Sequence, residues 1–200
     1  SGTMTVTDST LNINTQSVSN NFVGLDGRSG GTNELTLDNS TLTQGVAGAT
    51  TGSFYVGNRS TGVMNVTNGS TVHIPQYLYV GIYDVQTVSP FNPRGDGTLN
   101  VTGAGSSVTA VTRTRVGDAG TGTINVTDGA EFNSTNLYIG VFAAGVGTLN
   151  VTGSGSLVNA ATLLRAGDSG TGTISVGSGG RITTPTFEIG RFTTGVGTAN

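Results

Sequence analysis

The chain contains no cysteine, no tryptophan and no lysine, and only one histidine, His73, in 200 residues. Without cysteine it has neither a disulfide framework nor a thiolate metal site. Charge is also scarce, since only 10% of residues are charged and the formal net charge is −3. No basic stripe of the kind that binds nucleic acid is present, and no hydrophobic run suggests insertion of this segment into a membrane. No nucleic-acid partner and no direct membrane insertion are therefore expected.

Glycine is the most informative residue that is present, with 34 copies. A composition rich in glycine, serine, threonine and asparagine is typical of disordered chains. Here, however, the hydrophobic residues, 34% of the total, recur at fixed positions relative to the glycines. This regularity indicates an ordered repeat.

The second half of the chain, residues 97–196, consists of four consecutive copies of one 25-residue motif. A fixed period of about 20 to 50 residues is the signature of a solenoid, in which each unit buries its apolar side against its neighbours. The copies alternate between two types, so the full unit is a pair of 50 residues. The copies start at Gly97, Gly122, Gly147 and Gly172.

The first half of the chain, residues 1–96, contains less regular copies of the same repeat. Earlier repeats are predicted to start near Gly2, Gly31 and Gly62, and a further one starts at Gly197. Residues 1–200 are thus interpreted as a single segment of a longer repeat protein, with degenerate repeats over 1–96 and regular ones over 97–200.

Within each repeat the apolar and polar residues alternate, which is the period of a β-strand. In the Gly97 copy, Leu99 and Val101 face one way, while Thr98, Asn100 and Thr102 face the other. Three short strands per repeat, separated by glycine corners, predict an all-β fold: a right-handed parallel β-helix of seven to eight rungs. Equivalent aliphatics then form inward ladders, with Val101, Val126, Val151 and Val176 in one and Leu99, Ile124, Leu149 and Ile174 in another.

The phrase GTLNVTGxGS…VGDxGTGT resembles the repeats in passenger domains of bacterial autotransporters and related large surface proteins. The resemblance covers 97–200 well and 1–96 loosely. It implies an extracellular β-helical stalk at the bacterial cell surface that acts in adhesion or aggregation. The motif has no catalytic content.

A search for catalytic chemistry finds no convincing constellation. Carbohydrate-active enzymes need two carboxylates within about 5 to 9.5 Å of each other, whereas Asp118 and Asp168 share a corner position two repeats apart. A turn function, in which each aspartate bonds its own backbone, is preferred for both; catalysis and cation binding are the alternatives. No catalytic residue, metal ligand or cofactor is therefore assigned, and His73 has no partner at a fixed spacing.

One outward column of the last strand is the best candidate contact surface. From repeat to repeat it contains Tyr55, Tyr79, Arg115, Tyr138, Arg165 and Glu188. Cation–π contacts between the stacked side chains would stabilise the ladder, and the same aromatic groups could stack on a sugar ring or a protein partner. The five tyrosines and arginines of this column are candidate binding residues.

An insertion over Ile82–Asp96 supplies the second candidate surface. It places Tyr83, Phe91 and Arg94 on a long corner loop, where binding residues often gather. The insertion ends in Arg94-Gly95-Asp96, the tripeptide that integrins recognise. A loop without any binding function is the alternative explanation of the insertion.

These observations predict a non-enzymatic, extracellular structural or adhesive β-solenoid that makes weak multivalent contacts. Its expected partner is a host or bacterial surface protein or a glycan, and its open ends also favour end-to-end self-association. A carbohydrate-binding or carbohydrate-active β-helix is the alternative. Ice binding by the outward lattice of threonine and asparagine is a third hypothesis.

Overall fold

The computed structural model describes residues 1–13, 23–26, 31–45, 53–82 and 94–200. Within these ranges every regular element is a β-strand, and no helix occurs. The strands form two large parallel sheets, which we name sheet A and sheet B.

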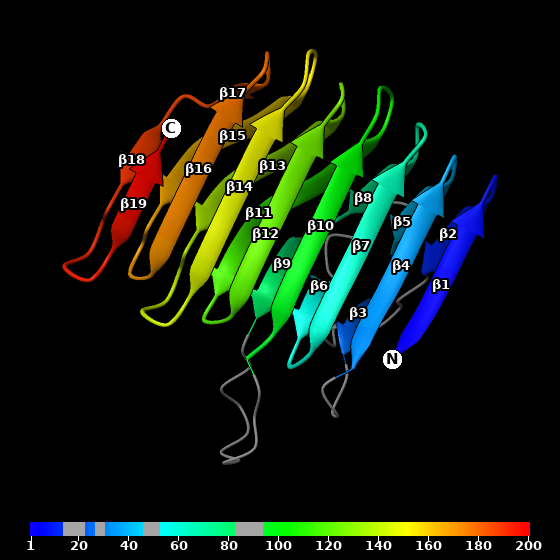
Figure 1. Ribbon diagram of the computed structural model, residues 1–200, viewed down its shortest axis with the longest axis horizontal. Helices are drawn as coiled ribbons and strands as arrows, with labels where there is room; N and C mark the ends of the chain where they lie inside the picture. Colours follow the sequence, from blue (N-terminus) through cyan, green and yellow to red (C-terminus); the bar gives the residue numbers. More distant parts are fainter. Residues whose placement is uncertain (14–22, 27–30, 46–52, 83–93) are drawn as a thin grey trace.

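Sheet A has eight parallel strands and runs the length of the molecule (Figure 1). Its strands are β1 (Gly2–Thr7), β4 (Thr32–Asp38), β7 (Thr61–Thr67), β10 (Asp96–Thr102), β12 (Thr121–Thr127), β14 (Val146–Thr152), β16 (Thr171–Gly177) and β19 (Val196–Ala199).

Sheet B has eleven strands, which also pair in parallel. They are β2 (Thr10–Ile13), β3 (Val23–Asp26), β5 (Thr41–Gln44), β6 (Ser53–Asn58), β8 (Thr71–Ile74), β9 (Tyr77–Ile82), β11 (Ser107–Asp118), β13 (Glu131–Ile139), β15 (Leu157–Ala166), β17 (Arg181–Thr183) and β18 (Phe187–Ile189).

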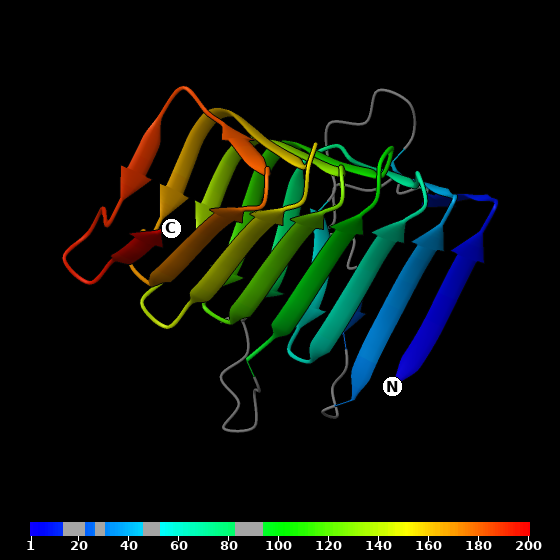
Figure 2. The ribbon, with the colours of Figure 1, turned by 45° about the horizontal axis from the view of Figure 1, so that its top comes forward.

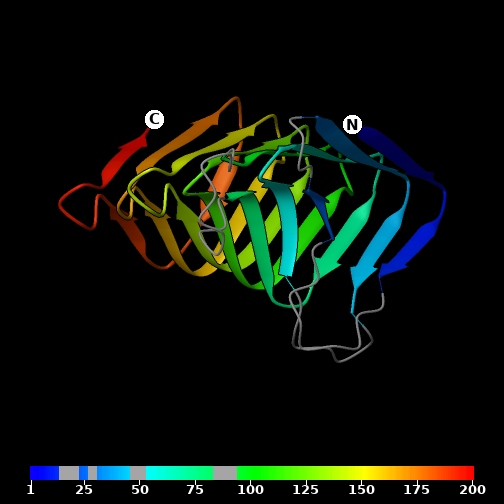
Figure 3. The same ribbon diagram turned by 90° about the horizontal axis from the view of Figure 1, so that it is seen from below.

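The chain passes from sheet A to sheet B and back in every repeat, and each return places the next strand of sheet A beside the previous one (Figure 2). Seen from below, the two sheets lie as layers with the chain ends at opposite ends of the stack (Figure 3). A single cluster of buried aliphatic and aromatic residues fills the space between the layers. This arrangement is consistent with the predicted β-solenoid.

The register of sheet A confirms the predicted inward ladders. Val101 is paired with Val126, Val126 with Val151, and Val151 with Val176. The first three are fully buried, whereas Val176, on the next-to-last strand of the sheet, is 39% exposed. Each buried aliphatic side chain contributes about 1.5–3 kcal/mol, so these ladders hold the two layers together.

The prediction of three short strands per repeat is wrong for the central repeats. There the second and third stretches join into single long strands, β11, β13 and β15, which bend at a register shift. At the shift Val111 and Thr112 of one repeat type lie opposite Thr135 of the other. A bulge of this kind bends a strand without ending it, and it takes up the one extra residue that β11 has at this point relative to β13.

The predicted repeat start at Gly31 is also wrong, by two residues. Asn33, and not Gly31, is paired with Gly2 on one side and with Gly62 on the other. The shift follows from the apolar residues, because Leu35 must enter the core beside Met64. With Gly31 opposite Gly62, Leu35 would still face inward, but Leu37 would lie opposite Asn68 in the turn. The observed register instead places Leu37 opposite Val66, so the apolar residues set the register and the glycine does not.

Two glycines per repeat make the tight corner from sheet B to sheet A. Gly117 has φ +68°, and a Cβ there would lie 2.3 Å from the backbone of Val146. Gly122, at the start of the next strand, would place a Cβ 2.1 Å from the carbonyl oxygen of Val80. Only glycine fits where backbones of adjacent repeats approach this closely, which explains the fixed glycine spacing.

Candidate functional site

The predicted contact column lies on the outer face of sheet B with the expected neighbours. Its order across β6, β9, β11, β13, β15 and β18 is Tyr55, Tyr79, Arg115, Tyr138, Arg165 and Glu188. Parallel pairing stacks these side chains at the spacing of adjacent strands, about 4.8 Å. The structure therefore brings the five candidate residues into one continuous column.

Aromatic and cationic groups contact one another along this column. The rings of Tyr55 and Tyr79 stack with centroids 5.0 Å apart. The guanidinium carbon of Arg115 lies 5.9 Å from the Tyr79 ring centroid, and that of Arg165 lies 5.1 Å from the Tyr138 centroid. Contacts of this type contribute about 0.5–1 kcal/mol each at exposed sites, so ladder stabilisation accounts for part of the column.

Arginine and aspartate three residues apart form ion pairs at the corner that follows the column. Arg115 donates to Asp118 Oδ1 at 3.2 Å, and Arg165 donates to Asp168 Oδ1 at 3.0 Å. The prediction that both aspartates serve as turn residues bonded to their own backbone is thus corrected. The repeated Arg-x-Gly-Asp spacing was the signal, because the positive-φ glycine folds the aspartate back towards the arginine.

Arg165 has a second carboxylate partner. Its Nε donates to Glu188 Oε2 at 2.6 Å, and Asp168 also lies 3.8 Å from Nη1 of Arg191. Although Arg165 points away from the core between the sheets, only 6% of its surface is exposed. A buried guanidinium requires such pairing, because an unpaired charge would be costly to desolvate.

Burial shifts two pKa values at this site. Desolvation raises the pKa of the Asp118 carboxyl above its usual 3.8, and the nearby Arg115 opposes the shift. Desolvation likewise raises the pKa of the Tyr79 hydroxyl, again against the field of Arg115. Tyr79 is therefore uncharged at neutral pH.

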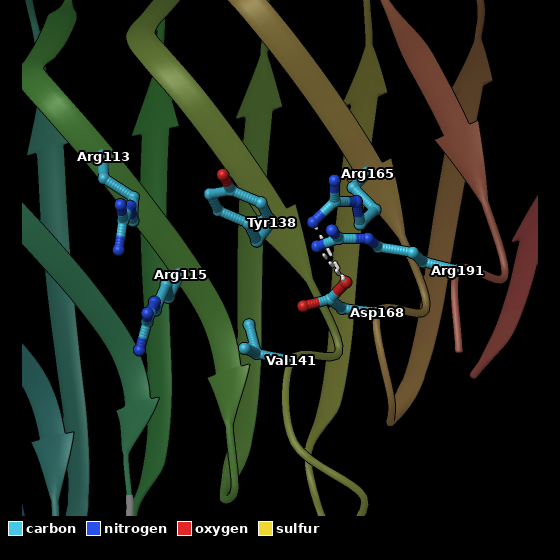
Figure 4. A pocket seen from close by; sticks show the side chains of 7 residues that line it. All are labelled: Arg113, Arg115, Tyr138, Val141, Arg165, Asp168 and Arg191. Carbon is cyan, nitrogen blue, oxygen red and sulfur yellow. Dashed lines mark hydrogen bonds and ion pairs between the residues drawn. The ribbon is translucent and has the colours of Figure 1, made fainter. Parts of the chain in front are cut away.

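A pocket of about 170 Å³ opens beside the column (Figure 4). Its lining contains Tyr138 at the centre, Arg113 and Arg115 on one side, and Arg165 and Arg191 on the other. Val141 and Asp168 complete the lining. Four of the eight arginines of an acidic chain therefore meet at one place.

Sequence reasoning missed Arg113, Arg191 and Val141 in this lining. Arg113 follows the bulge in β11, so its place two residues before Arg115 on the same face was the only available signal. The guanidinium carbon of Arg113 lies 5.6 Å from the centroids of both Tyr77 and Tyr138. Tyr138 is thus flanked by two arginines, Arg113 and Arg165.

Two exposed phenylalanines beside the pocket were also missed. Phe142 is 52% exposed and Phe192 is 51% exposed. They occupy equivalent positions 50 residues apart, in the longer corners VFAAG and RFTTG. Each ring lies next to a pocket arginine, with Arg115 at 5.7 Å from the Phe142 centroid and Arg191 at 4.7 Å from the Phe192 centroid.

The second predicted surface, the Ile82–Asp96 insertion, lies mostly outside the described residues, which exclude Tyr83 and Phe91. Arg94 is exposed and donates to the Ala144 carbonyl at 3.4 Å. Gly95 is buried, with its amide bonded to the Ile82 carbonyl, and Asp96 is the first residue of β10. The Arg-Gly-Asp tripeptide therefore forms part of the stacked corner and is not a projecting tip.

The outer face of sheet A carries a hydrogen-bonded asparagine ladder. The side-chain amide of Asn150 donates to Asn125, Asn125 to Asn100, and Asn100 to Asn65, each at 2.8 Å. Asn65 in turn donates to Glu34 Oε1 at 2.7 Å. The middle column of the lattice considered for ice binding thus bonds along the stack, which favours a stabilising function for it.

The described ranges contain no group of three or more His, Asp or Glu residues arranged to hold a metal ion. His73 is exposed on β8. In the same ranges no helix has the length and apolarity needed to cross a membrane. Comparison of the chain with known protein families, with curated proteins and with solved structures found no match.

Proposed function

We propose that this chain is a non-enzymatic binding scaffold: an extracellular, adhesive β-solenoid segment of a bacterial surface protein similar to autotransporter passengers. In this proposal the solenoid is a right-handed parallel β-helix of seven rungs and the start of an eighth. Crossover connections between parallel strands are almost always right-handed, and this supports the right-handed assignment of the β-helix. The eight strands of sheet A support the number of rungs.

The observation that carries this proposal is the continuous arginine–tyrosine column on the outer face of sheet B. Arginine and tyrosine are the residues most enriched at binding hot spots, because they combine a large contact area with hydrogen-bonding groups. Here they recur from repeat to repeat on a rigid sheet. Tyr79, Arg115 and Tyr138 are its partly exposed members, whereas Tyr55 and Arg165 are buried and support the others. Such a surface suits many weak contacts made at once, in which avidity exceeds the affinity of any single contact.

The state of the acidic residues supports binding over catalysis. Asp118 and Asp168 are both paired with arginines, and Glu188 is bonded to Arg165. A general acid or base needs a carboxyl that is within reach of substrate and able to exchange its proton. These carboxylates serve instead to hold guanidinium groups in place.

The test compares adhesion by beads coated with the chain and by beads coated with a Tyr79→Ser/Tyr138→Ser variant. We expect the parent beads to bind bacterial or animal cells and the variant beads to bind several-fold fewer. Thr123→Ser, on the outer face of sheet A, is the matched control and should bind normally. Circular dichroism spectra must be the same for all three proteins. Equal adhesion by parent and variant would remove the column from the binding surface.

A glycan-binding function is the second candidate, favoured by Phe142 and Phe192. Exposed aromatic rings on a rigid surface stack against the apolar faces of sugars and bury area that water otherwise covers. Replacement of both residues by Ser should then reduce retention on immobilised polysaccharide, while a protein ligand bound at the column would be retained unchanged.

A further inference from the structure

We infer that the pocket lined by Arg113, Arg115, Tyr138, Arg165 and Arg191 binds a single oxyanion group, a carboxylate or a sulfate, of an acidic polysaccharide. The inference rests on the proposed function, since it names the ligand chemistry of the same face of sheet B. It depends on the charge balance of the pocket, on unbonded guanidinium nitrogens and on the two exposed rings beside it.

The charge balance leaves the pocket positive. Four arginines line or enter it, and three carboxylates pair with them: Asp118, Asp168 and Glu188. One positive charge therefore has no counterpart. Arg113 is the arginine of the pocket that takes part in no ion pair within the part of the chain that the structure describes. Its guanidinium contacts the rings of Tyr77 and Tyr138, and its charge acts on Asp118 only through space.

Hydrogen-bonding capacity is also left over. The Nε atoms of Arg113 and Arg115 are buried and have no hydrogen-bond partner among the described residues. A guanidinium presents its N–H groups as a planar fork that matches two oxygens of a carboxylate, sulfate or phosphate. Arginine remains charged at any physiological pH. An oxyanion in the pocket would supply the missing negative charge, and rotation of the Arg113 or Arg115 guanidinium towards it would give the buried Nε–H an acceptor.

The size and position of the pocket suit one anionic group on a longer ligand. Its volume of about 170 Å³ is more than ten times the roughly 15 Å³ that a single water molecule requires by the same measure. The pocket is open to solvent, so the rest of the ligand can continue across the sheet. Arg191 is 50% exposed at its mouth.

The flanking rings favour a polysaccharide over an acidic peptide. Phe142 and Phe192 lie two repeats apart, about 10 Å at the spacing of adjacent strands, and each is next to a pocket arginine. A sugar chain offers an apolar ring face beside each anionic substituent and therefore matches alternating rings and arginines. An acidic peptide such as polyglutamate would use the arginines but leave both rings exposed.

The test uses the full chain in solution and follows the Nε–H resonances of its eight arginines during titration with heparin oligosaccharide. We expect the resonances of Arg113 and Arg115 to shift and the affinity to fall with added salt. Arg113→Gln should weaken binding about tenfold or more. Arg113→Lys should recover only part of the loss, because it restores the charge without the fork. Arg181→Gln, at an exposed arginine of β17, is the control and should bind like the parent.

The same titration is repeated with dextran, a neutral polysaccharide, and with polyglutamate, an acidic peptide. Melting temperatures of all variants are measured to check that they fold. Equal binding of neutral dextran, or an Arg113→Gln variant that folds and binds like the parent, would overturn the inference. Binding of polyglutamate as tight as that of heparin would overturn the polysaccharide assignment. Absence of heparin binding alongside column-dependent cell adhesion would overturn this inference alone, whereas absence of cell adhesion by the parent beads would overturn the proposed function.

Discussion

In sheet A the central strands β10, β12, β14 and β16 are each seven residues long and pair without a register shift. In sheet B the strands formed by the same repeats range from 12 residues in β11 to 3 in β17, and they contain bulges. Both faces of sheet A carry ladders of like residues, aliphatic inside and asparagine outside. The inner face of sheet B is buried but less uniform, since Thr114 lies opposite Leu137 and Ser134 lies between two alanines. Its outer face varies most in chemistry, with tyrosine, arginine and glutamate in one column, and the arginine-lined pocket lies there.

Val151→Asp, in the core of sheet A, tests this comparison with the largest expected effect. Val151 is fully buried between two valines, and an unpaired charge there should cost about 4 kcal/mol or more. That is a large part of the stability of an ordinary domain. Asn159→Asp places the same charge on the outer face of β15 and should change stability by less than about 1 kcal/mol. Urea denaturation measures both; similar midpoints would refute the core assignment.

The second largest effect is expected at the corners, where the two kinds of corner should differ in the stability lost on a Gly→Ala substitution. Gly117→Ala, at the corner from sheet B to sheet A, combines positive φ with a backbone 2.3 Å from the new Cβ. It should destabilise by about 3 kcal/mol. Gly103→Ala, at the opposite corner, also has positive φ but meets no atom within 4 Å, and about 1 kcal/mol is expected. Melting temperatures distinguish them, and equal losses would show that close backbone approach is unimportant.

A smaller effect is expected when the asparagine ladder is cut. Asn125 donates to Asn100 and accepts from Asn150, so Asn125→Ala should cost about 1–2 kcal/mol. Asn133, on the outer face of β13, bonds only to Glu131 of its own strand, and Asn133→Ala should be nearly neutral. Chemical denaturation of the two variants would expose the difference. A neutral Asn125→Ala would mean that the ladder adds no net stability.

The smallest expected effect is the contribution of Asp118 to the pH dependence of folding stability. Because burial raises the folded-state pKa of Asp118 above its usual 3.8, the folded state retains the Asp118 proton to a higher pH than the unfolded state. The favourable contribution of this group is therefore complete below pH 3.8 and declines as pH rises through the raised pKa. Asp118→Asn should remove that decline. Melting curves of parent and variant over this window provide the test, and parallel curves would contradict it.

Sequence reasoning predicted the uniform parts of the molecule well. The valine ladder and the arginine–tyrosine column followed from counting outward and inward positions from a repeated Gly, since parallel stacking keeps like positions together. The repeat start at Gly31 and the function of Asp118 were misjudged for a common reason. Gly31 was placed from glycine spacing and Asp118 was interpreted from turn chemistry, whereas apolar residues such as Leu37 in the core and Arg115 across the corner decided the outcome.

Part of the pocket could have been predicted, because Arg113 lies two residues before Arg115 and therefore on the same face of the strand. Val141 and Arg191 could not, because they lie in the corners after β13 and β18, where strand alternation no longer fixes the direction of a side chain. Phe142 and Phe192, in contrast, share a corner position at a spacing of 50 residues and could have been found from the repeat.

The asparagine ladder has a direction. Every amide N–H points towards the amino-terminal end of the stack, and the last one meets the carboxylate of Glu34. Aligned amides polarise one another, so their dipoles add along the row. The row therefore has a net dipole, and its positive end meets a carboxylate. An acidic residue at the amino terminus of a helix interacts with the helix dipole in the same way. A neutral side chain at Glu34 would leave that pole uncompensated.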